Sequence, residues 1–270
     1  MKKCFTINPF RTTEDFRDYE KLLDDNIYQA IEIFYPYNLS EENQKIYFEN
    51  VKRIKEKFDI EVVMHLPHGP ENNLCDFLDY NKIIDRMEKG MDFTSHFNTK
   101  KLTLHLGQVD KTVAREKHIE HIVKVLKELC LYAKKYEMNV MIENMPQDNE
   151  LGYSPYEIKE IIDKVNLDNL KFILDTGHAH VSSYSNIEYI EVLKDKLYHM
   201  HFSDNNGSTD QHKRIGLGNI DFVEILKKLH EINYDELHCM EVIFKKADEL
   251  REFATDIEKC DILSRNIQFK

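Results

Sequence analysis

Short apolar runs alternate with longer amphipathic stretches along most of the chain. The runs are rich in β-branched, aromatic and other apolar residues, which is typical of the buried strands of a parallel sheet. The predicted strands occupy residues 3–7, 30–34, 61–66, 101–106, 139–144, 170–175, 197–202 and 237–242. Helical periodicity is clear in several of the stretches between them, at residues 41–58, 80–97, 113–136 and 222–232.

Two short motifs mark predicted helix starts. Ser154 with Glu157, and Asp221 with Glu224, have the spacing of a capping box, in which the first side chain accepts a hydrogen bond from the backbone three residues later. Proline follows Ser154, at the first helical position, where its missing N–H is not needed.

The alternation predicts a closed (β/α)8 barrel, or TIM barrel, that spans residues 1–270 as a single domain. An open doubly wound sheet is the alternative, but the turn after its first strand is usually glycine-rich. Residues 8–16 here read NPFRTTEDF. With 8 glycines and 6 prolines, the chain has no low-complexity linker that would divide it.

Residue types that bind metals stand at the ends of six consecutive predicted strands. The carboxyl ends of barrel strands converge on one rim, where TIM-barrel active sites lie. The six residues are His65, His105, Glu143, Asp175, His201 and Glu241. Imidazoles mixed with carboxylates suit zinc or manganese better than calcium or magnesium. We therefore expect a divalent metal centre of one to three ions, in which Glu143 can bridge two of them.

Each of these residues also has a simpler interpretation. A single histidine at a strand end is more often a hydrogen-bonded structural residue, whereas Glu143, within the apolar segment NVMIENMP, is costly to bury without a partner. In the third strand, His68 competes with His65 as the ligand. The other histidines are expected to be structural, solvated or half-buried at His96, His118, His121 and His230, and in the barrel wall at His199 and His238.

An ordered set of motifs resembles the xylose isomerase-like TIM-barrel superfamily. The set comprises Glu143, LDTGHAH at 174–180, His201, Asp210 with His212, and Glu241. That superfamily unites metal-dependent sugar isomerases and epimerases with abasic-site nucleases of the endonuclease IV type. The resemblance covers the third to the eighth predicted strand and implies the same barrel.

The epimerase branch implies one divalent metal held by Glu143, Asp175, His201 and Glu241. In that branch the two glutamates would act as acid and base on opposite faces of a metal-bound ketose. By the same resemblance, His178 would bind the substrate near a sugar hydroxyl.

The endonuclease IV branch implies three zinc ions and a hydroxide that attacks a phosphate. All nine ligand positions carry a suitable residue here: His65, His105, Glu143, Asp175, His178, His201, Asp210, His212 and Glu241.

Three other features favour a sugar over DNA as the substrate. Glu32 in IEIFYPYN resembles the isomerase pattern and is a candidate substrate-binding residue, whereas the nuclease branch usually has a Gln- and Arg-bearing loop there. The loop at 8–16 also lacks that branch's glycine-rich, serine-bearing motif, and the formal net charge of −12 disfavours a broad basic surface. Nucleic acid is therefore the less favoured partner.

The leading hypothesis is a metal-dependent isomerase or epimerase of a sugar or sugar phosphate. The alternatives are a three-zinc abasic-site phosphodiesterase and a barrel that binds metal or ligand without catalysis. Lys213 and Arg214 are candidate contacts for a substrate phosphate, whereas Gly216 and Gly218 are expected to form a tight turn and not a phosphate cradle.

The remaining composition bears on location and assembly. Five scattered cysteines without C-x-x-C spacing are expected to be reduced packing residues. No apolar run approaches the length of about 18 residues that spans a membrane, and the start MKKCFTINPF lacks a signal segment. We therefore expect a cytoplasmic protein without membrane contact, and the resemblance implies a homo-oligomer.

Overall fold

Eight parallel strands close into a barrel in the computed structural model, which describes residues 1–7 and 16–266. Each strand pairs with its sequence neighbours, and β1 pairs with β8 through Cys4 and Cys239. The strands are β1 (Lys2–Thr6), β2 (Ala30–Phe34), β3 (Glu61–His65), β4 (Lys101–Leu104), β5 (Asn139–Glu143), β6 (Leu170–Asp175), β7 (Leu197–Phe202) and β8 (Leu237–Met240). The closed TIM barrel is confirmed, and the open-sheet alternative is wrong because β1 and β8 are hydrogen-bonded.

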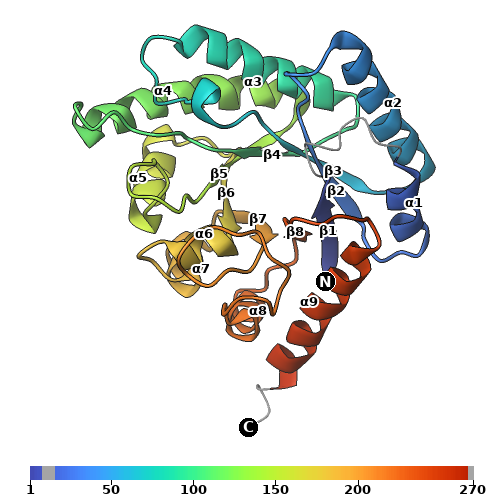
Figure 1. Cartoon of the computed structure of the whole chain (residues 1–270). Helices are drawn as coiled ribbons and strands as arrows, with labels where there is room; N and C mark the ends of the chain where they lie inside the picture. The colour runs from blue at the N-terminus through green and yellow to red at the C-terminus, as the bar shows by residue number, and fades with distance from the viewer. Residues whose placement is uncertain (8–15, 267–270) are drawn as a thin grey trace.

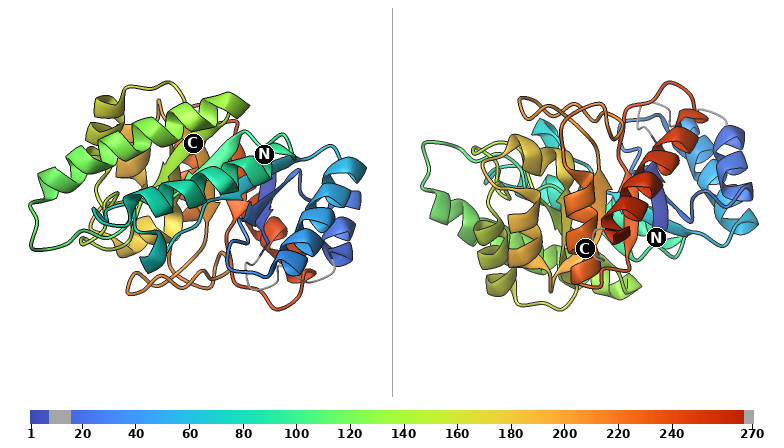
Figure 2. Two further views of the ribbon diagram at one scale, coloured as in Figure 1. Left: turned by 90° about the horizontal axis from the view of Figure 1, so that it is seen from above. Right: turned by 90° about the horizontal axis from the view of Figure 1, so that it is seen from below.

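Helices surround the strands on the outside of the barrel (Figure 1 and Figure 2). They are α1 (Arg17–Asp24), α2 (Glu41–Lys57), α3 (Tyr80–Ser95), α4 (Arg115–Ala133), α5 (Pro155–Val165), α6 (Thr176–Val181), α7 (Asn186–Leu193), α8 (Phe222–Glu231) and α9 (Glu249–Asn266), with short 3-10 turns η2 (Pro70–Asn72) and η3 (Lys134–Tyr136). The last helix packs beside the first strand, where Lys3 pairs with Glu258.

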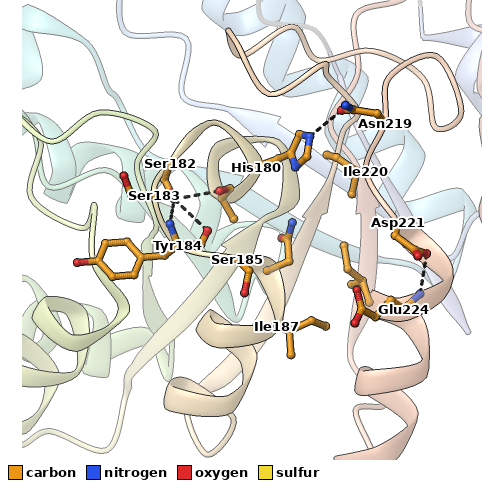
Figure 3. Close-up of a pocket in the computed structure, with 13 residues that line it drawn as sticks. His180, Ser182, Ser183, Tyr184, Ser185, Ile187, Asn219, Ile220, Asp221 and Glu224 are labelled. Atoms are coloured by element: carbon orange, nitrogen blue, oxygen red, sulfur yellow. Dashed lines mark hydrogen bonds between the residues drawn. The ribbon is translucent and has the colours of Figure 1, made fainter.

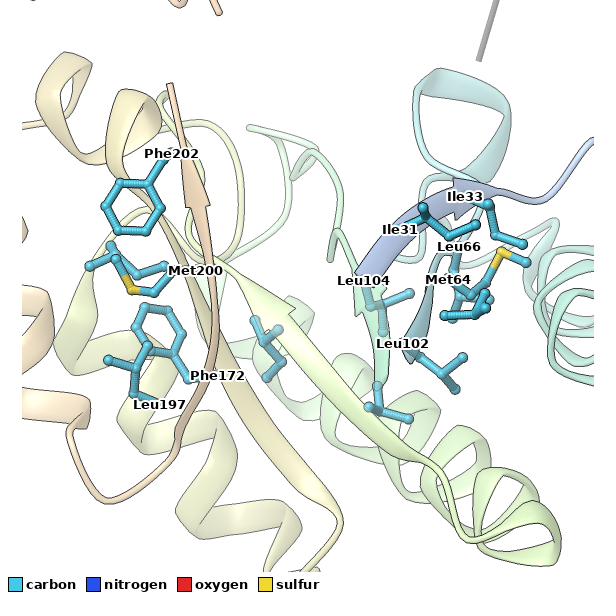
Figure 4. Close-up of a cluster of buried hydrophobic side chains, with 14 of the residues drawn as sticks. Ile31, Ile33, Met64, Leu66, Leu102, Leu104, Phe172, Leu197, Met200 and Phe202 are labelled. Atoms are coloured by element: carbon cyan, nitrogen blue, oxygen red, sulfur yellow. The ribbon is translucent and has the colours of Figure 1, made fainter. Parts of the chain in front are cut away.

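The strand residues alternate between two cores. Side chains that point outward, such as Ile31 on β2 and Phe172 on β6, are buried between the strands and the helices (Figure 4). The inward side chains form a smaller cluster, to which Met141 of β5 belongs. Because the strand period is two, Glu143 points into the barrel two residues after Met141.

Several boundaries differ from the predictions by one or two residues. Strand β4 ends at Leu104 and β8 ends at Met240, so His105 and Glu241 lie just beyond the regular strands. The predicted helix at 113–136 is divided into α4 and η3. The loop at 8–16 was used above as evidence against an open sheet and against the nuclease branch. Residues 8–15 of this loop lie outside the described residues.

The two predicted capping boxes have different outcomes. Asp221 caps α8 by accepting the Glu224 N–H at 3.0 Å. Ser154 precedes α5 but makes no side-chain cap hydrogen bond. The prediction of a capping box at this helix is therefore wrong. The Glu157 carboxylate instead accepts the Gly152 N–H at 2.9 Å and pairs with Arg115, which holds it away from the Ser154 backbone.

His118 is fully buried, so its assignment as a solvated or half-buried residue is wrong. It lies on the face of α4 that packs inward with Ile119 and Ile122, and its Nε2 accepts the Asp110 N–H at 3.2 Å. The five cysteines are free, as expected, and only Cys260 among them is half-buried. Among the described residues, no helix has the length and apolar character needed to cross a membrane.

Candidate metal centre

One group of side chains surrounds Nδ1 of His201 at the carboxyl end of β7. Glu143 Oε1 lies 3.2 Å from this nitrogen and Glu241 Oε2 lies 3.0 Å from it. Asp175 Oδ2 lies 4.0 Å away, from β6, which pairs Asp175 directly with His201 in the sheet. One ligand atom from each of the four residues lies within 4.8 Å of the others. This is the spacing of a single metal site.

A second group uses the other carboxylate oxygen of Glu143. Oε2 lies 3.0 Å from His105 Nε2 and 3.6 Å from His65 Nε2. The carboxylate therefore faces two ligand groups, with one oxygen toward each. This is the arrangement of a carboxylate that bridges two ions.

The third group joins the loop after β7 to the start of α6. Asp210 Oδ2 lies 2.8 Å from His212 Nε2 and 3.3 Å from His178 Nε2. All nine residues of the proposed ligand set are thus distributed over three adjoining groups. The structure brings His65 into the second group, whereas His68 is exposed and belongs to none of the groups found among the described residues.

In four of the histidines, the ring nitrogen that does not face the ligand group contacts an oxygen of the protein. Nδ1 of His65 contacts the Leu66 carbonyl at 2.9 Å, and Nδ1 of His178 contacts the Asn144 carbonyl at 2.9 Å. Nδ1 of His212 lies 3.0 Å from the Glu241 carbonyl, and Nε2 of His201 lies 2.8 Å from the Glu32 carboxylate. With the proton on that nitrogen, each ring donates to its partner and presents its lone pair to the group.

The motif LDTGHAH forms the sharp connection from β6 into α6. Asp175 caps α6, since its Oδ1 accepts the His178 N–H at 2.7 Å, and this leaves Oδ2 for the group around His201. A Cβ on Gly177 would lie 2.4 Å from Ser203 Oγ, so only glycine fits there. The sequence analysis missed Asn144, whose side chain makes two hydrogen bonds to the backbone of Asp175. Its Oδ1 accepts the Asp175 N–H at 2.7 Å, and its Nδ2 donates to the Asp175 carbonyl at 3.0 Å.

The carboxylates and imidazoles of the cluster shift each other's pKa values. Burial alone would raise the pKa of Glu143, but the charge and hydrogen-bond interactions with His201 and His105 hold it well below its ordinary value. Burial alone would lower the pKa of His201, but the surrounding carboxylates, Glu241 foremost, raise it well above the ordinary value. Burial raises the pKa of Asp175 to about 7. Glu143 and His201 therefore stabilise each other's charged forms.

Two carboxylate oxygens of the cluster lack a hydrogen-bond partner among the described residues. Oδ2 of Asp175 and Oδ1 of Asp210 are both buried and accept no hydrogen bond. A buried unpaired carboxylate oxygen is costly, and a cation removes that cost. The donor set of imidazoles and carboxylates therefore fits divalent metal ions.

Residues 23–260 match the family model described as xylose isomerase-like TIM barrel. The chain belongs to this family. A probable endonuclease 4 of Mycoplasmopsis synoviae is 27% identical over 198 residues, which cover 66% of this chain and 67% of that protein.

Solved structures share the fold of this xylose isomerase-like barrel. A D-tagatose 3-epimerase-like protein superposes with a TM-score of 0.79 at 23% identity, covering 96% of this chain and 99% of that one. IolI, solved with a binding zinc atom, superposes with a TM-score of 0.77 at 22% identity, covering 98% and 99%.

A cavity of about 380 Å³ opens beside the candidate metal-binding groups of the barrel. His105, His178 and Asp210 form part of its wall. Polar side chains of the loops after β3, β4 and β5 form much of the rest, and the sequence analysis missed them: Asn72, Asn73, Gln108, Gln147 and Glu150. The cavity has the size and polarity for a small polar molecule.

Another cavity, of about 350 Å³, lies between the α6–α7 connection and the start of α8 (Figure 3). His180 and Asn219 are joined across its edge at 2.7 Å. None of the nine candidate ligands lines this cavity. It is separate from the metal centre.

Three proposed substrate-binding residues lie away from the 380 Å³ cavity wall. The Arg214 guanidinium is paired with Glu252 and Asp256 on α9. Lys213 pairs through its backbone with Asp204 at 2.8 and 2.9 Å. Glu32 is fully buried inside the barrel, beneath the candidate ligand His201. None of the three lines the cavity.

The segment with Gly216 and Gly218 is a tight turn around a buried carboxylate. Oδ2 of Asp204 accepts the N–H groups of Gly216 and Gly218 at 2.8 and 2.9 Å. A Cβ on Gly218 would lie 2.1 Å from the Asn205 carbonyl oxygen. The amides that a phosphate cradle would need are therefore already bonded.

Proposed function

We propose that the chain is a divalent-metal-dependent isomerase or epimerase of a small ketose sugar. The observation that carries this proposal is the polar cavity of about 380 Å³ that opens directly onto His105, His178 and Asp210. Side-chain amides line it, and amides bind hydroxyl groups as both donors and acceptors. The net charge of −12 disfavours a polyanionic partner.

The residues that would hold the metal are Glu143, Asp175, His201 and Glu241, and their mixed oxygen and nitrogen donors suit zinc or manganese. An ion bound there would polarise a substrate carbonyl and make the neighbouring C–H more acidic.

Glu143 and Glu241 are the proposed acid and base. Both approach His201 Nδ1, at 3.2 and 3.0 Å, which places both carboxylates at the proposed metal site. One ionised carboxylate takes the proton from the carbon next to the carbonyl. The other, protonated, returns a proton to the opposite face of the same carbon, which gives an epimer. A proton returned instead to the former carbonyl carbon gives an isomer, and the hydroxyl proton of the neighbouring carbon then passes to the former carbonyl oxygen.

The other assigned residues have supporting roles in this proposal. His178 lines the cavity, where it would bind a sugar hydroxyl. Arg214 would contact a sugar phosphate only after leaving Glu252 and Asp256, and this favours an unphosphorylated substrate. Glu32 is fully buried and does not line the cavity, so it would not contact a sugar bound there. The cytoplasmic location and the homo-oligomer stay predictions of the sequence.

A three-ion phosphodiesterase is the second candidate, and the third ligand group favours it. His178 and His212 both direct Nε2 at Asp210 Oδ2, whose partner oxygen is buried without a hydrogen bond in the described structure. The similarity to a probable endonuclease 4 supports the same candidate.

Two assays on one preparation separate the candidates. The metal-loaded protein is incubated with a panel of ketoses, and with a duplex that contains one abasic site. The chelator-treated protein is the control in both assays. We expect a new sugar isomer and an intact duplex. Incision of the duplex with no change in any sugar would overturn the isomerase proposal in favour of the phosphodiesterase.

A further inference from the structure

Glu32 is a buried carboxylate with both oxygens engaged inside the barrel. Its side chain is fully buried. Oε1 accepts the Thr103 hydroxyl at 2.8 Å. Oε2 lies 2.8 Å from His201 Nε2 and 3.1 Å from His199 Nε2. The carboxylate is therefore fixed from two other strands, β4 and β7, and has no free oxygen to offer a substrate.

We infer that Glu32 is a positioning residue that fixes His201 as an Nδ1 metal ligand, an inference that rests on the metal centre proposed above. A neutral imidazole carries one N–H. With that proton on Nε2 and donated to Glu32, the lone pair is on Nδ1, which faces Glu143 and Glu241 at 3.2 and 3.0 Å. A carboxylate at the far nitrogen also makes the imidazole a stronger donor to a metal.

Thr103 and His199 make this orientation rigid. Thr103 on β4 holds one oxygen of Glu32, and His199, two residues before His201 on β7, shares the other. The register of the barrel thus brings β2, β4 and β7 to one point beneath the ligands. The role of Glu32 is to orient a ligand from inside the barrel.

A competing arrangement is an ion bound inside the barrel itself. Glu32, His199, His201 and Cys239 also offer ligand atoms within 4.8 Å of one another. An ion there would occupy Nε2 of His201 and would take Cys239 as a thiolate ligand. The two arrangements place different atoms on His201 Nε2, a proton or a metal, and this difference can be measured.

The test compares the full-length wild type with E32Q, E32A and T103V. Zinc affinity is measured by competition with a chelator, and the cobalt-loaded proteins are compared by visible absorption. E32A is expected to weaken zinc binding at the His201 site by about 10- to 100-fold and to alter the cobalt spectrum. E32Q should lose less, because its amide oxygen still accepts the Nε2 proton. T103V removes one contact that holds Glu32 but leaves the Glu32–His201 contact in place, so it should lose less zinc affinity than E32A.

Melting temperatures of the chelator-treated variants control for folding. Nitrogen-15 NMR of the histidines in the zinc-loaded wild type needs no variant, and we expect His201 to carry its proton on Nε2. A proton on Nδ1, or E32A with wild-type affinity and spectrum, would overturn the inference. So would a thiolate-to-cobalt absorption band that C239S removes. A wild type that binds no metal would overturn the metal centre itself, which distinguishes the two failures.

Discussion

Glu241 Oε2 lies 3.0 Å from Nδ1 of His201, so a carboxylate proposed as a catalytic acid or base sits directly beside a proposed metal ligand. The same nitrogen lies 3.2 Å from Glu143 Oε1. Removing either carboxylate therefore tests proton transfer at a defined place in the barrel.

Replacing Glu143 or Glu241 with Gln should lower turnover of the ketose by about 10²- to 10⁴-fold, because the amide cannot take or return the proton. Initial rates with saturating metal measure the loss. The matched control is Glu137→Gln, whose side chain is 85% exposed and pairs with Lys100. A Glu143→Gln or Glu241→Gln protein with full turnover would eliminate the two-glutamate mechanism.

His212→Ala should remove one metal ion per chain, because His212 Nε2 lies 2.8 Å from Asp210 Oδ2 in the third group. Elemental analysis before and after the change counts the ions. The control is His180→Ala, since His180 is a histidine of α6 that bonds to Asn219 instead. The isomerase account predicts that the variant keeps ketose turnover within about tenfold. Complete loss of sugar turnover with the loss of that ion would contradict it.

Metal affinity should fall as the pH falls. Burial opposes charge on His212, but Asp210 and Glu241 raise the pKa of this histidine to about 10 in the metal-free protein. A metal must displace that proton, so each unit of lower pH weakens binding by about tenfold per displaced proton. The pKa of Asp175, raised by burial to about 7, makes the dependence steeper below that pH. Chelator competition between about pH 6 and about pH 9 measures the slope; affinity independent of pH would show that the histidines are not ligands.

Asp204→Asn should destabilise the protein by about 2–3 kcal/mol, because the carboxylate accepts three backbone N–H groups of the turn that follows His212. Urea unfolding measures the free energy difference. The control is Asp195→Asn, at an exposed position. The loop also carries Asp210, so the variant should lose metal from the third group first. Unchanged stability would mean that the turn forms without Asp204.

The ligand set could be predicted because parallel strands end at one rim. His65, Glu143 and Asp175 are the last residues of β3, β5 and β6, and spacing along the chain was enough to place them together. The orientation of each ring could not be predicted. His178, for example, contacts the carbonyl of Asn144, which is 34 residues earlier in the chain.

The depth at which a side chain lies inside the barrel was harder to predict than the strand to which the residue belongs. Glu32 was assigned to substrate binding because it resembles the isomerase pattern in the second strand. Phe34 ends β2, so Glu32 lies two residues deeper and points inward beneath the rim, where it meets His201. The cavity residues Asn72 and Gln108 lie outside the helices and strands that periodicity predicts. Hydrophobic periodicity does not indicate which loop side chains line a cavity.

Hydrogen exchange from solvent tests the central claim most directly. The metal-loaded wild type and Glu143→Gln are incubated with the ketose panel in D2O, and the recovered sugars are examined by NMR. The isomerase account predicts deuterium on the carbon next to the carbonyl of one sugar and in its isomer, with the wild type only. If the wild type, with its metal content verified, introduces no deuterium into any ketose of the panel, the account is contradicted.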